Sequence, residues 1–299
     1  MRLVTPPSLR RGDRIGVAAP AGPPDRARLE KGLALLERRG FVVEPGRHLF
    51  DRHAYLAGRD ADRLDDLNGM LRDPALKAIW FARGGYGLHR LVAGVDLRAL
   101  RRAPKALIGY SDITVIQSAA WRRMRLASFQ APMVQELGDR RAYDAASLWR
   151  TLRGGGLRLR FPEGSVVRPG SARGPLVGGC LSILVSLVGT PYEPPLDGAI
   201  LYWEEVNEAP FRIDRMLAHL RLSGRLKRLA GMVVGRLVDC RARRAADQVD
   251  LRDILAVHLA GTAYPVVIDL PAGHGPGKVT LPIGFPARLD TAARRLSAR

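Results

Sequence analysis

The chain has 299 residues, of which 46% are hydrophobic and 26% charged, a composition typical of a soluble globular protein with about two domains. No apolar run approaches the roughly 20 residues of a membrane-spanning helix, so we expect no membrane contact. The net charge of +19 would suit a nucleic-acid-binding protein. However, the arginines are spread along the whole chain, and no basic arm, zinc finger or RNP-like motif occurs. We therefore expect no specific nucleic-acid binding, and instead a positive field that attracts an acidic substrate.

Cysteine usage and motif spacing argue against a disulfide framework, a metal site and a P-loop. The two cysteines, Cys180 and Cys240, form neither a disulfide framework nor a zinc motif. The first residues lack the apolar core of a signal peptide, so we expect a cytoplasmic protein. No histidine pair has metal-ligand spacing, and Gly277-Lys278 is not a P-loop because Val279 replaces the Ser or Thr. We expect no metal and no cofactor.

The first half of the chain alternates predicted strands and helices. Strands are expected at residues 14–19, 41–44, 78–81 and 106–110. One helix is expected between the capping residue Asp25 and Gly40, and another at 60–71. This alternation implies βαβ units, and hence a mostly parallel sheet with both faces covered. Ligands bind at the carboxyl ends of the strands in such sheets.

The second half follows a change of composition at residues 153–175, which are rich in glycine and proline. Beyond it, strands are expected at 200–203, 231–234 and 266–269, and helices at 214–222 and 250–259. We therefore predict an α/β protein of two domains joined by a linker region. These are an N-terminal parallel-sheet βαβ domain at 1–152, a linker region at 153–175, and a C-terminal α/β domain at 176–299.

Ser111 lies where a predicted strand turns into a helix. The apolar residues 106–108 end at Gly109, and Ile113 and Ile116 begin a helical pattern. This is the arrangement of a nucleophile elbow, although Ile113 replaces the last glycine of the usual G-x-S-x-G. The alternative is that Ser111 only caps the helix.

Four motifs, in this order, resemble the signature set of the LD-carboxypeptidase family. They are Arg83-Gly84-Gly85-Tyr86-Gly87, Gly109-Tyr110-Ser111-Asp112, the segment from Trp203 to Leu217, and Pro271-Ala272-Gly273-His274-Gly275. The resemblance extends over nearly the whole chain. It implies a serine peptidase with a Ser-Glu-His triad and no metal or cofactor.

The resemblance assigns the triad to Ser111, Glu204 and His274. His274 lies between two glycines that let its ring approach other residues closely, although a simple loop histidine would fit the same pattern. Glu204 follows an apolar strand, and the alternative there is a solvated pair with Glu205. The three residues occur in the chain order of the α/β-hydrolases. Because they are far apart in sequence, the assignment implies an active site assembled between the two domains. In these roles Ser111 is the nucleophile, His274 the general base, and Glu204 the group that orients the histidine.

Backbone N–H groups are needed to stabilise the oxyanion of an acyl-transfer reaction. Asp112, directly after the nucleophile, and Gly85 are the candidates for these donors. Arg83, Gly84 and Tyr110 are the substrate-binding candidates.

Two departures from the family pattern put the substrate fit in question. Gln130-Ala131-Pro132 replaces His-Gly-Pro, and Cys180 replaces the asparagine of Gly-Gly-Asn.

The resemblance implies cleavage of an L,D amide bond that releases D-alanine from a muropeptide tetrapeptide in cell-wall recycling, by a cytoplasmic homodimer. One alternative is a microcin-immunity-type hydrolase that cleaves phosphoramidate or sulfamate bonds of aminoacyl nucleotides. Residues 174–203 are too short for the longer aromatic loop of that type. An alternative of another class is a non-enzymatic anion- or nucleic-acid-binding protein.

Overall fold

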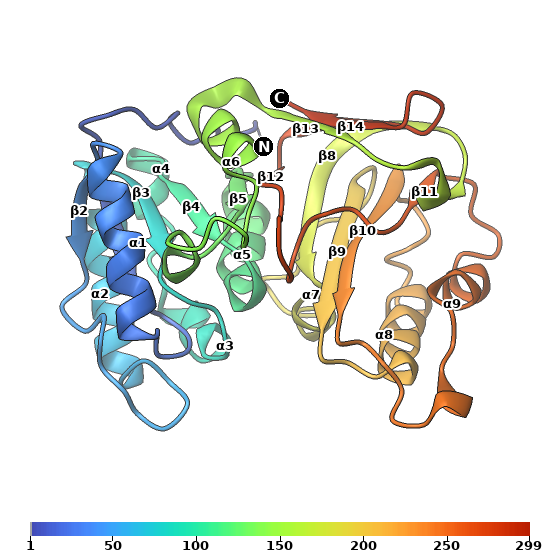
Figure 1. The fold of residues 1–299 in the computed structure, drawn as a ribbon, viewed down its shortest axis with the longest axis horizontal. Coiled ribbons are helices and arrows are strands. Elements are labelled where there is room, and N and C mark those ends of the chain that lie inside the picture. The colour runs from blue at the N-terminus through green and yellow to red at the C-terminus, as the bar shows by residue number, and fades with distance from the viewer. Residues whose placement is uncertain (1) are drawn as a thin grey trace.

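The computed structural model describes residues 2–299 and contains two β-sheets that lie side by side (Figure 1). The first sheet has the strand order β12-β5-β4-β3-β1-β2. Its strands are β1 (Arg14–Ala18), β2 (Val42–Pro45), β3 (Leu76–Phe81), β4 (Ala106–Gly109), β5 (Ser128–Gln130) and β12 (Leu281–Ile283). All neighbours are parallel except β12, which runs antiparallel to β5.

Helices cover both faces of this sheet, which explains why β3 is buried on both sides. The helices are α1 (Arg26–Arg38), α2 (Asp60–Arg72), α3 (Leu88–Leu91), α4 (Ala99–Arg102), α5 (Thr114–Met124) and α6 (Ala145–Arg150). Apolar residues of α1 and α6 pack on one face of the sheet, and those of α2, α4 and α5 on the other. As predicted, Asp25 caps α1 by accepting the N–H of Arg28, and Gly40 follows its end with φ at 88°.

The second sheet has eight strands in the order β6-β14-β13-β8-β9-β10-β11-β7. They are β6 (Leu157–Arg160), β7 (Val166–Arg168), β8 (Ser171–Cys180), β9 (Ile200–Val206), β10 (Gly231–Val238), β11 (Val266–Val267), β13 (Pro286–Asp290) and β14 (Arg295–Ala298). The β8-β9-β10-β11 part is parallel, whereas β7, β13, β14 and β6 pair antiparallel.

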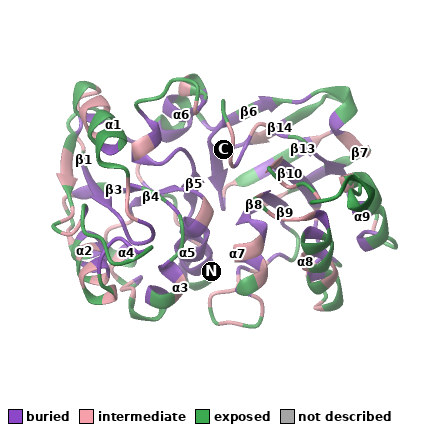
Figure 2. Cartoon of the chain, turned by 60° about the horizontal axis from the view of Figure 1, so that its bottom comes forward, coloured by how far each residue is buried: buried purple, intermediate pink, exposed green. Residues whose placement is uncertain are grey.

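Three helices cover one face of the second sheet: α7 (Leu181–Ser186), α8 (Pro210–Leu222) and α9 (Leu251–His258). On the other face the sheet curls, so that Leu289 and Leu296 of β13 and β14 pack against Ile200 and Val233 of the central strands. Figure 2 shows these central strands as buried, with exposed residues on the outer sides of α8 and α9.

Short helical turns connect these elements. They are η1 (Val92–Gly94), η2 (Ser111–Ile113), η3 (Val134–Glu136), η4 (Thr151–Gly155), η5 (Glu163–Ser165) and η6 (Ala245–Asp247). No helix among residues 2–299 is long and apolar enough to cross a membrane.

The α/β fold class is confirmed, and the strands predicted in the first half lie within two residues of the observed ones. Residues 153–175 are more structured than we expected, because they contain β6, β7 and the start of β8. The predicted strand at 266–269 is only the two residues of β11, and α8 begins at Pro210, four residues earlier than expected. β12 lies within the predicted C-terminal domain, at 176–299, but completes the first sheet by pairing with β5.

The two sheets meet where β8 lies against the first turn of α5. A Cβ atom at Gly179 would be 2.3 Å from Thr114 Oγ1, so only glycine allows this approach. The backbone N–H of Cys180 donates to the same oxygen at 3.2 Å. Because α5 follows Ser111 and β8 neighbours the strand of Glu204, this contact brings the two halves of the candidate site together.

Candidate active site

Ser111 lies at the turn between β4 and α5, at the start of η2 (Ser111–Ile113). Its φ of 60° is in the left-handed region, which costs a non-glycine residue about 1–2 kcal/mol. The surrounding structure holds this turn in place. The buried Gln117 side chain donates to the carbonyl oxygens of Gly109 and Phe129 at 3.1 and 3.0 Å. A strained serine after a buried strand has the backbone geometry of a nucleophile elbow.

His274 forms a close pair with Glu204 at the carboxyl half of β9. Its Nδ1 lies 2.6 Å from Glu204 Oε2, and its backbone N–H donates to the same oxygen at 3.0 Å. Glu204 is fully buried, whereas the His274 side chain is 16% exposed. A hydrogen bond from Nδ1–H to the carboxylate leaves Nε2 as the acceptor of a neutral ring. The pair thus has the orientation of a general base and its supporting acid.

Gly273 is needed for this approach. A Cβ atom there would lie 2.4 Å from Glu204 Cγ, and the φ of Gly273 is 91°. Both the space and the backbone conformation therefore require glycine. Of the two glycines beside His274, Gly273 therefore allows the close approach of the histidine to Glu204, as we expected.

Tyr110 connects the serine turn to the histidine. Its ring packs edge-on against His274, with 4.8 Å between the ring centroids. Its hydroxyl donates to Glu136 Oε1 at 2.9 Å, and Lys278 Nζ donates to the same oxygen at 2.7 Å. Burial, followed by the charge of Glu136, raises the pKa of Tyr110 well above its ordinary value, so the hydroxyl stays a donor. Lys278 belongs to the same loop as His274, so the network joins that loop to the residue next to Ser111.

Glu205 has different neighbours from Glu204. Its carboxylate accepts the backbone N–H groups of Ser182 at 2.7 Å and Val206 at 3.0 Å, and the Cys180 thiol lies 3.3 Å away. Burial raises the pKa of Glu205. The two adjacent glutamates therefore point to opposite sides of β9, and only Glu204 contacts the histidine.

Cys180 occupies the position where the family pattern has asparagine, and its thiol is buried. Burial and the charges of Glu204 and Glu205 raise the pKa of this thiol well above its ordinary value. A nucleophilic cysteine needs a lowered pKa, so this environment argues against a cysteine mechanism.

The glycine pair after β3 lies directly against Ser111. A Cβ atom at Gly84 would be 3.0 Å from Ser111 Cβ and 3.2 Å from Ser111 Oγ. Gly85 has a φ of 110°, and the carbonyl of Gly84 accepts the N–H of Gly22 at 2.9 Å. The N–H of Gly85 donates to no acceptor among residues 2–299. It is therefore free to bind a ligand close to the serine.

Asp112 connects this glycine loop to the serine turn. Its Oδ2 accepts the backbone N–H of Leu88 at 2.9 Å, at the start of the helix that follows the glycine loop. Burial raises the pKa of Asp112 to about 6. Arg83, a substrate-binding candidate, is exposed, and its guanidinium donates to the carbonyl of Pro23 at 2.6 Å.

Sequence reasoning did not identify Glu136 and Lys278 as part of this region. Lys278 lies four residues after His274 in the same glycine-rich segment, a weak signal. Nothing in the residues around Glu136 indicated a role. Gln130, singled out as a departure from the family pattern, is buried and donates to Gln117 Oε1 at 2.7 Å, so it supports the serine turn through its neighbour.

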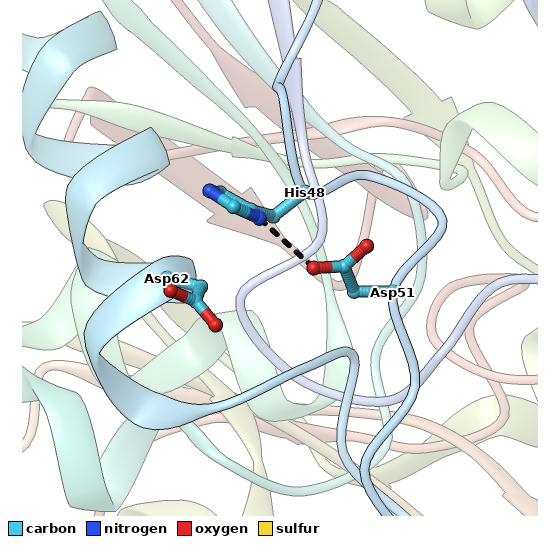
Figure 3. A group of neighbouring side chains, drawn as sticks. All are labelled: His48, Asp51 and Asp62. Atoms are coloured by element: carbon cyan, nitrogen blue, oxygen red, sulfur yellow. Dashed lines mark hydrogen bonds and ion pairs between the residues drawn. The ribbon is translucent and has the colours of Figure 1, made fainter.

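A group that could hold a metal ion lies between the loop after β2 and the first turn of α2 (Figure 3). It consists of His48, Asp51 and Asp62, with ligand atoms within 4.8 Å of one another. His48 Nδ1 is 2.9 Å from Asp51 Oδ2, and this hydrogen bond raises the pKa of the imidazole. All three residues are at least partly exposed, and the ion pair accounts for the closeness of His48 and Asp51.

Comparison with known proteins identifies the class to which this fold and site belong. Residues 15–131 match the LD-carboxypeptidase N-terminal domain, and residues 173–289 match the LD-carboxypeptidase C-terminal domain. A relative from Bacillus subtilis, named "Probable murein peptide carboxypeptidase", is 37% identical over 97% of this chain and 92% of its own length.

Solved structures show the same fold. The muramoyltetrapeptide carboxypeptidase from Oxalobacter formigenes is 30% identical, with a TM-score of 0.84 over 95% of this chain and 97% of that one. The microcin C7 self-immunity protein MccF, an inactive mutant in the apo state, has a TM-score of 0.88 at 22% identity, over 99% and 98% of the two chains. The chain belongs to the LD-carboxypeptidase family.

Proposed function

We propose that this protein is a serine carboxypeptidase that hydrolyses an L,D amide bond and releases D-alanine from a muropeptide tetrapeptide. The observation that carries the proposal is the His274–Glu204 pair, at 2.6 Å, beside the strained turn of Ser111. In the proposed mechanism Ser111 Oγ attacks the scissile carbonyl, and His274 Nε2 takes the serine proton. Glu204 stabilises the imidazolium that forms.

The backbone N–H groups of Gly85 and Asp112 are the proposed donors to the oxyanion of the tetrahedral intermediate. Collapse of the intermediate breaks the amide bond, and His274 gives its proton to the leaving amine of D-alanine. A water molecule then attacks the acyl-enzyme. His274 takes a proton from this water and returns it to Ser111, which restores the free enzyme.

The substrate class rests on the names of relatives. The Oxalobacter formigenes structure is named a muramoyltetrapeptide carboxypeptidase, and it is 30% identical to this chain. A side chain at Gly84 would crowd the Ser111 hydroxyl, and Arg83 and Tyr110 are the proposed contacts for the peptide. The excess of arginine favours a substrate with several carboxylates.

The test is product analysis with pure muropeptides and an aminoacyl sulfamoyl nucleotide. We expect mass spectrometry to show loss of one alanine from tetrapeptides and no cleavage of tripeptides. Ser111→Ala and His274→Ala should each lower kcat by about 10⁴-fold or more, and the double variant should be hardly worse, because the residues act as a unit. Cleavage of the nucleotide alone would favour the microcin-immunity-type function. An unlabelled Ser111 after a serine-directed activity probe, with no product, would favour a non-enzymatic binding protein.

We further propose that the enzyme works in the cytoplasm as a homodimer. Cys180 and Cys240 are both free thiols, which suits a reducing compartment. Light scattering on the purified protein tests the oligomeric state, and a monomer at micromolar concentration would contradict the dimer.

A further inference from the structure

A cavity of about 850 Å³ lies at the opposite end of β8 from the candidate active site. Arg173 lines it near the start of β8, and Cys180 ends that strand beside Glu205. Seven residues of strand separate these positions, which corresponds to about 23 Å. The C-terminus, marked in Figure 1 close to β13 and β14, also belongs to this end of the molecule. The cavity is therefore distinct from the catalytic groups.

The strand register places arginines in a row along one wall of this cavity. Arg158 of β6 is opposite Ser297 of β14, Ser297 is opposite Arg288 of β13, and Arg288 is opposite Arg173 of β8. Directly opposite residues of antiparallel strands point to the same face of a sheet. The intervening residues point the other way, into the core: Leu159, Leu296, Leu289 and Ala172. The row thus follows from the hydrophobic alternation of four strands.

Few carboxylates neutralise this row. Arg288 pairs with Asp290 at 2.9 Å, but Arg158 and Arg173 have no acidic partner among residues 2–299. Arg125 also lines the cavity and adds a guanidinium stacked over Trp121, at 4.8 Å from the ring centroid. Asp197 also lines the cavity, but it already pairs with Arg228. Like charges directly opposite each other destabilise a sheet, so an anion between them would relieve a cost that the folded protein carries.

We propose that this cavity binds a small molecule that carries several linked phosphate groups. The row spans four strands, or about 14 Å at the usual spacing between strands, which is too long for one phosphate ion. Guanidinium groups bind phosphate oxygens in a bidentate manner and remain charged at any physiological pH. A second copy of this chain would bring the same positive charges against the row, so it is a poor occupant. The concave shape favours a small molecule over the backbone of a nucleic acid.

The probe is inorganic tripolyphosphate, with orthophosphate and a random-sequence DNA duplex measured alongside it. Binding is measured by calorimetry at ~0.15 M salt, because weak surface attraction is largely screened there. The test variant is Arg158→Gln/Arg173→Gln, which removes two exposed, unpaired guanidiniums. The matched control is Arg241→Gln/Arg243→Gln, which removes two exposed arginines after β10 and gives the same net charge.

We expect tripolyphosphate to bind the wild type and the control with one site per chain, and orthophosphate to bind at least about tenfold more weakly. The test variant should bind tripolyphosphate about 100-fold more weakly, since each lost charge-assisted contact is worth about tenfold. Both variants should keep the wild-type rate of substrate hydrolysis, because the cavity is remote from Ser111. Equal binding by the two variants, or no binding to the wild type, would overturn the proposal. Tighter binding of DNA than of tripolyphosphate, lost in the test variant, would also overturn it and indicate a nucleic-acid surface.

Discussion

Glu204 and Glu205 show how strongly neighbouring positions on a strand can differ. Successive side chains of a strand point to opposite faces, so one glutamate contacts His274 and the other accepts a backbone N–H in the first turn of α7. Composition and pattern treat the two residues as equivalent. Their surroundings give them separate tasks, of which only the first touches the proposed catalytic base.

Glu204→Gln should therefore lower kcat by about 10⁴-fold, on the scale known for a triad acid replaced by its amide. The amide can hold the imidazole in the wrong tautomer and cannot stabilise its charged form. Glu205→Gln is the matched control, with the same chemical change one residue away, and should keep activity within about tenfold of the wild type. Steady-state kinetics on the tetrapeptide, with circular dichroism as a check on folding, measures both. A large loss of kcat in Glu205→Gln, with little loss in Glu204→Gln, would show that the roles of the two glutamates are reversed.

At the scale of elements, Asp112 joins the turn before α5 to the start of α3 by accepting the Leu88 N–H. Burial raises its pKa from 3.8 to about 6, so the folded protein holds this proton more tightly than the unfolded chain does. The ionised carboxylate thus costs stability, a cost that is absent below pH 3.8 and complete above about pH 6. At neutral pH, therefore, the ionised Asp112 side chain weakens the fold.

Asp112→Asn should remove this cost, because an amide accepts the Leu88 N–H but carries no charge. The difference in the free energy of unfolding, variant minus wild type, should increase by up to about 3 kcal/mol as pH rises from about 4 to 7. Denaturant unfolding at several pH values measures the difference. Asp112→Ala is the contrasting variant: it also removes the charge but leaves the Leu88 N–H without an acceptor, so it should be less stable than Asp112→Asn at every pH. A difference between wild type and Asp112→Asn that does not vary with pH would contradict the raised pKa.

The elements around Ser111 could be predicted from sequence because each depends on local pattern. The buried run before Gly109 and the helical spacing of Ile113 and Ile116 suffice to indicate a strand, a turn and a helix. Residues 153–175 could not be read this way. Strand β6 pairs with β14, and β7 pairs with β11, and both partners follow roughly a hundred residues or more later in the chain. Short strands that pair with distant segments have too few residues to show a clear alternation of apolar and polar side chains.

At the scale of the whole molecule, the candidate site depends on contacts that link distant parts of the chain. Lys278 and Glu136 are 142 residues apart, yet their charged groups lie 2.7 Å from each other in a largely buried position. No pairwise pattern in a single sequence reveals such a contact. The family resemblance could supply the triad because its residues carry motifs, but it could not supply this ion pair.

Lys278→Met should cost about 3–5 kcal/mol, because it leaves the buried Glu136 carboxylate without a cation, with only the Tyr110 hydroxyl and the Met133 N–H as partners. Adding Glu136→Gln to Lys278→Met should recover most of this loss, since the second change removes the uncompensated charge. The four proteins form a double-mutant cycle, measured by denaturant unfolding, with an expected coupling of about 1–3 kcal/mol. Lys278→Met should also lower kcat more than it changes KM, because Tyr110 packs against His274 and is held by the same carboxylate. If the losses of stability in the two single variants simply add in the double variant, Lys278 and Glu136 are not energetically coupled.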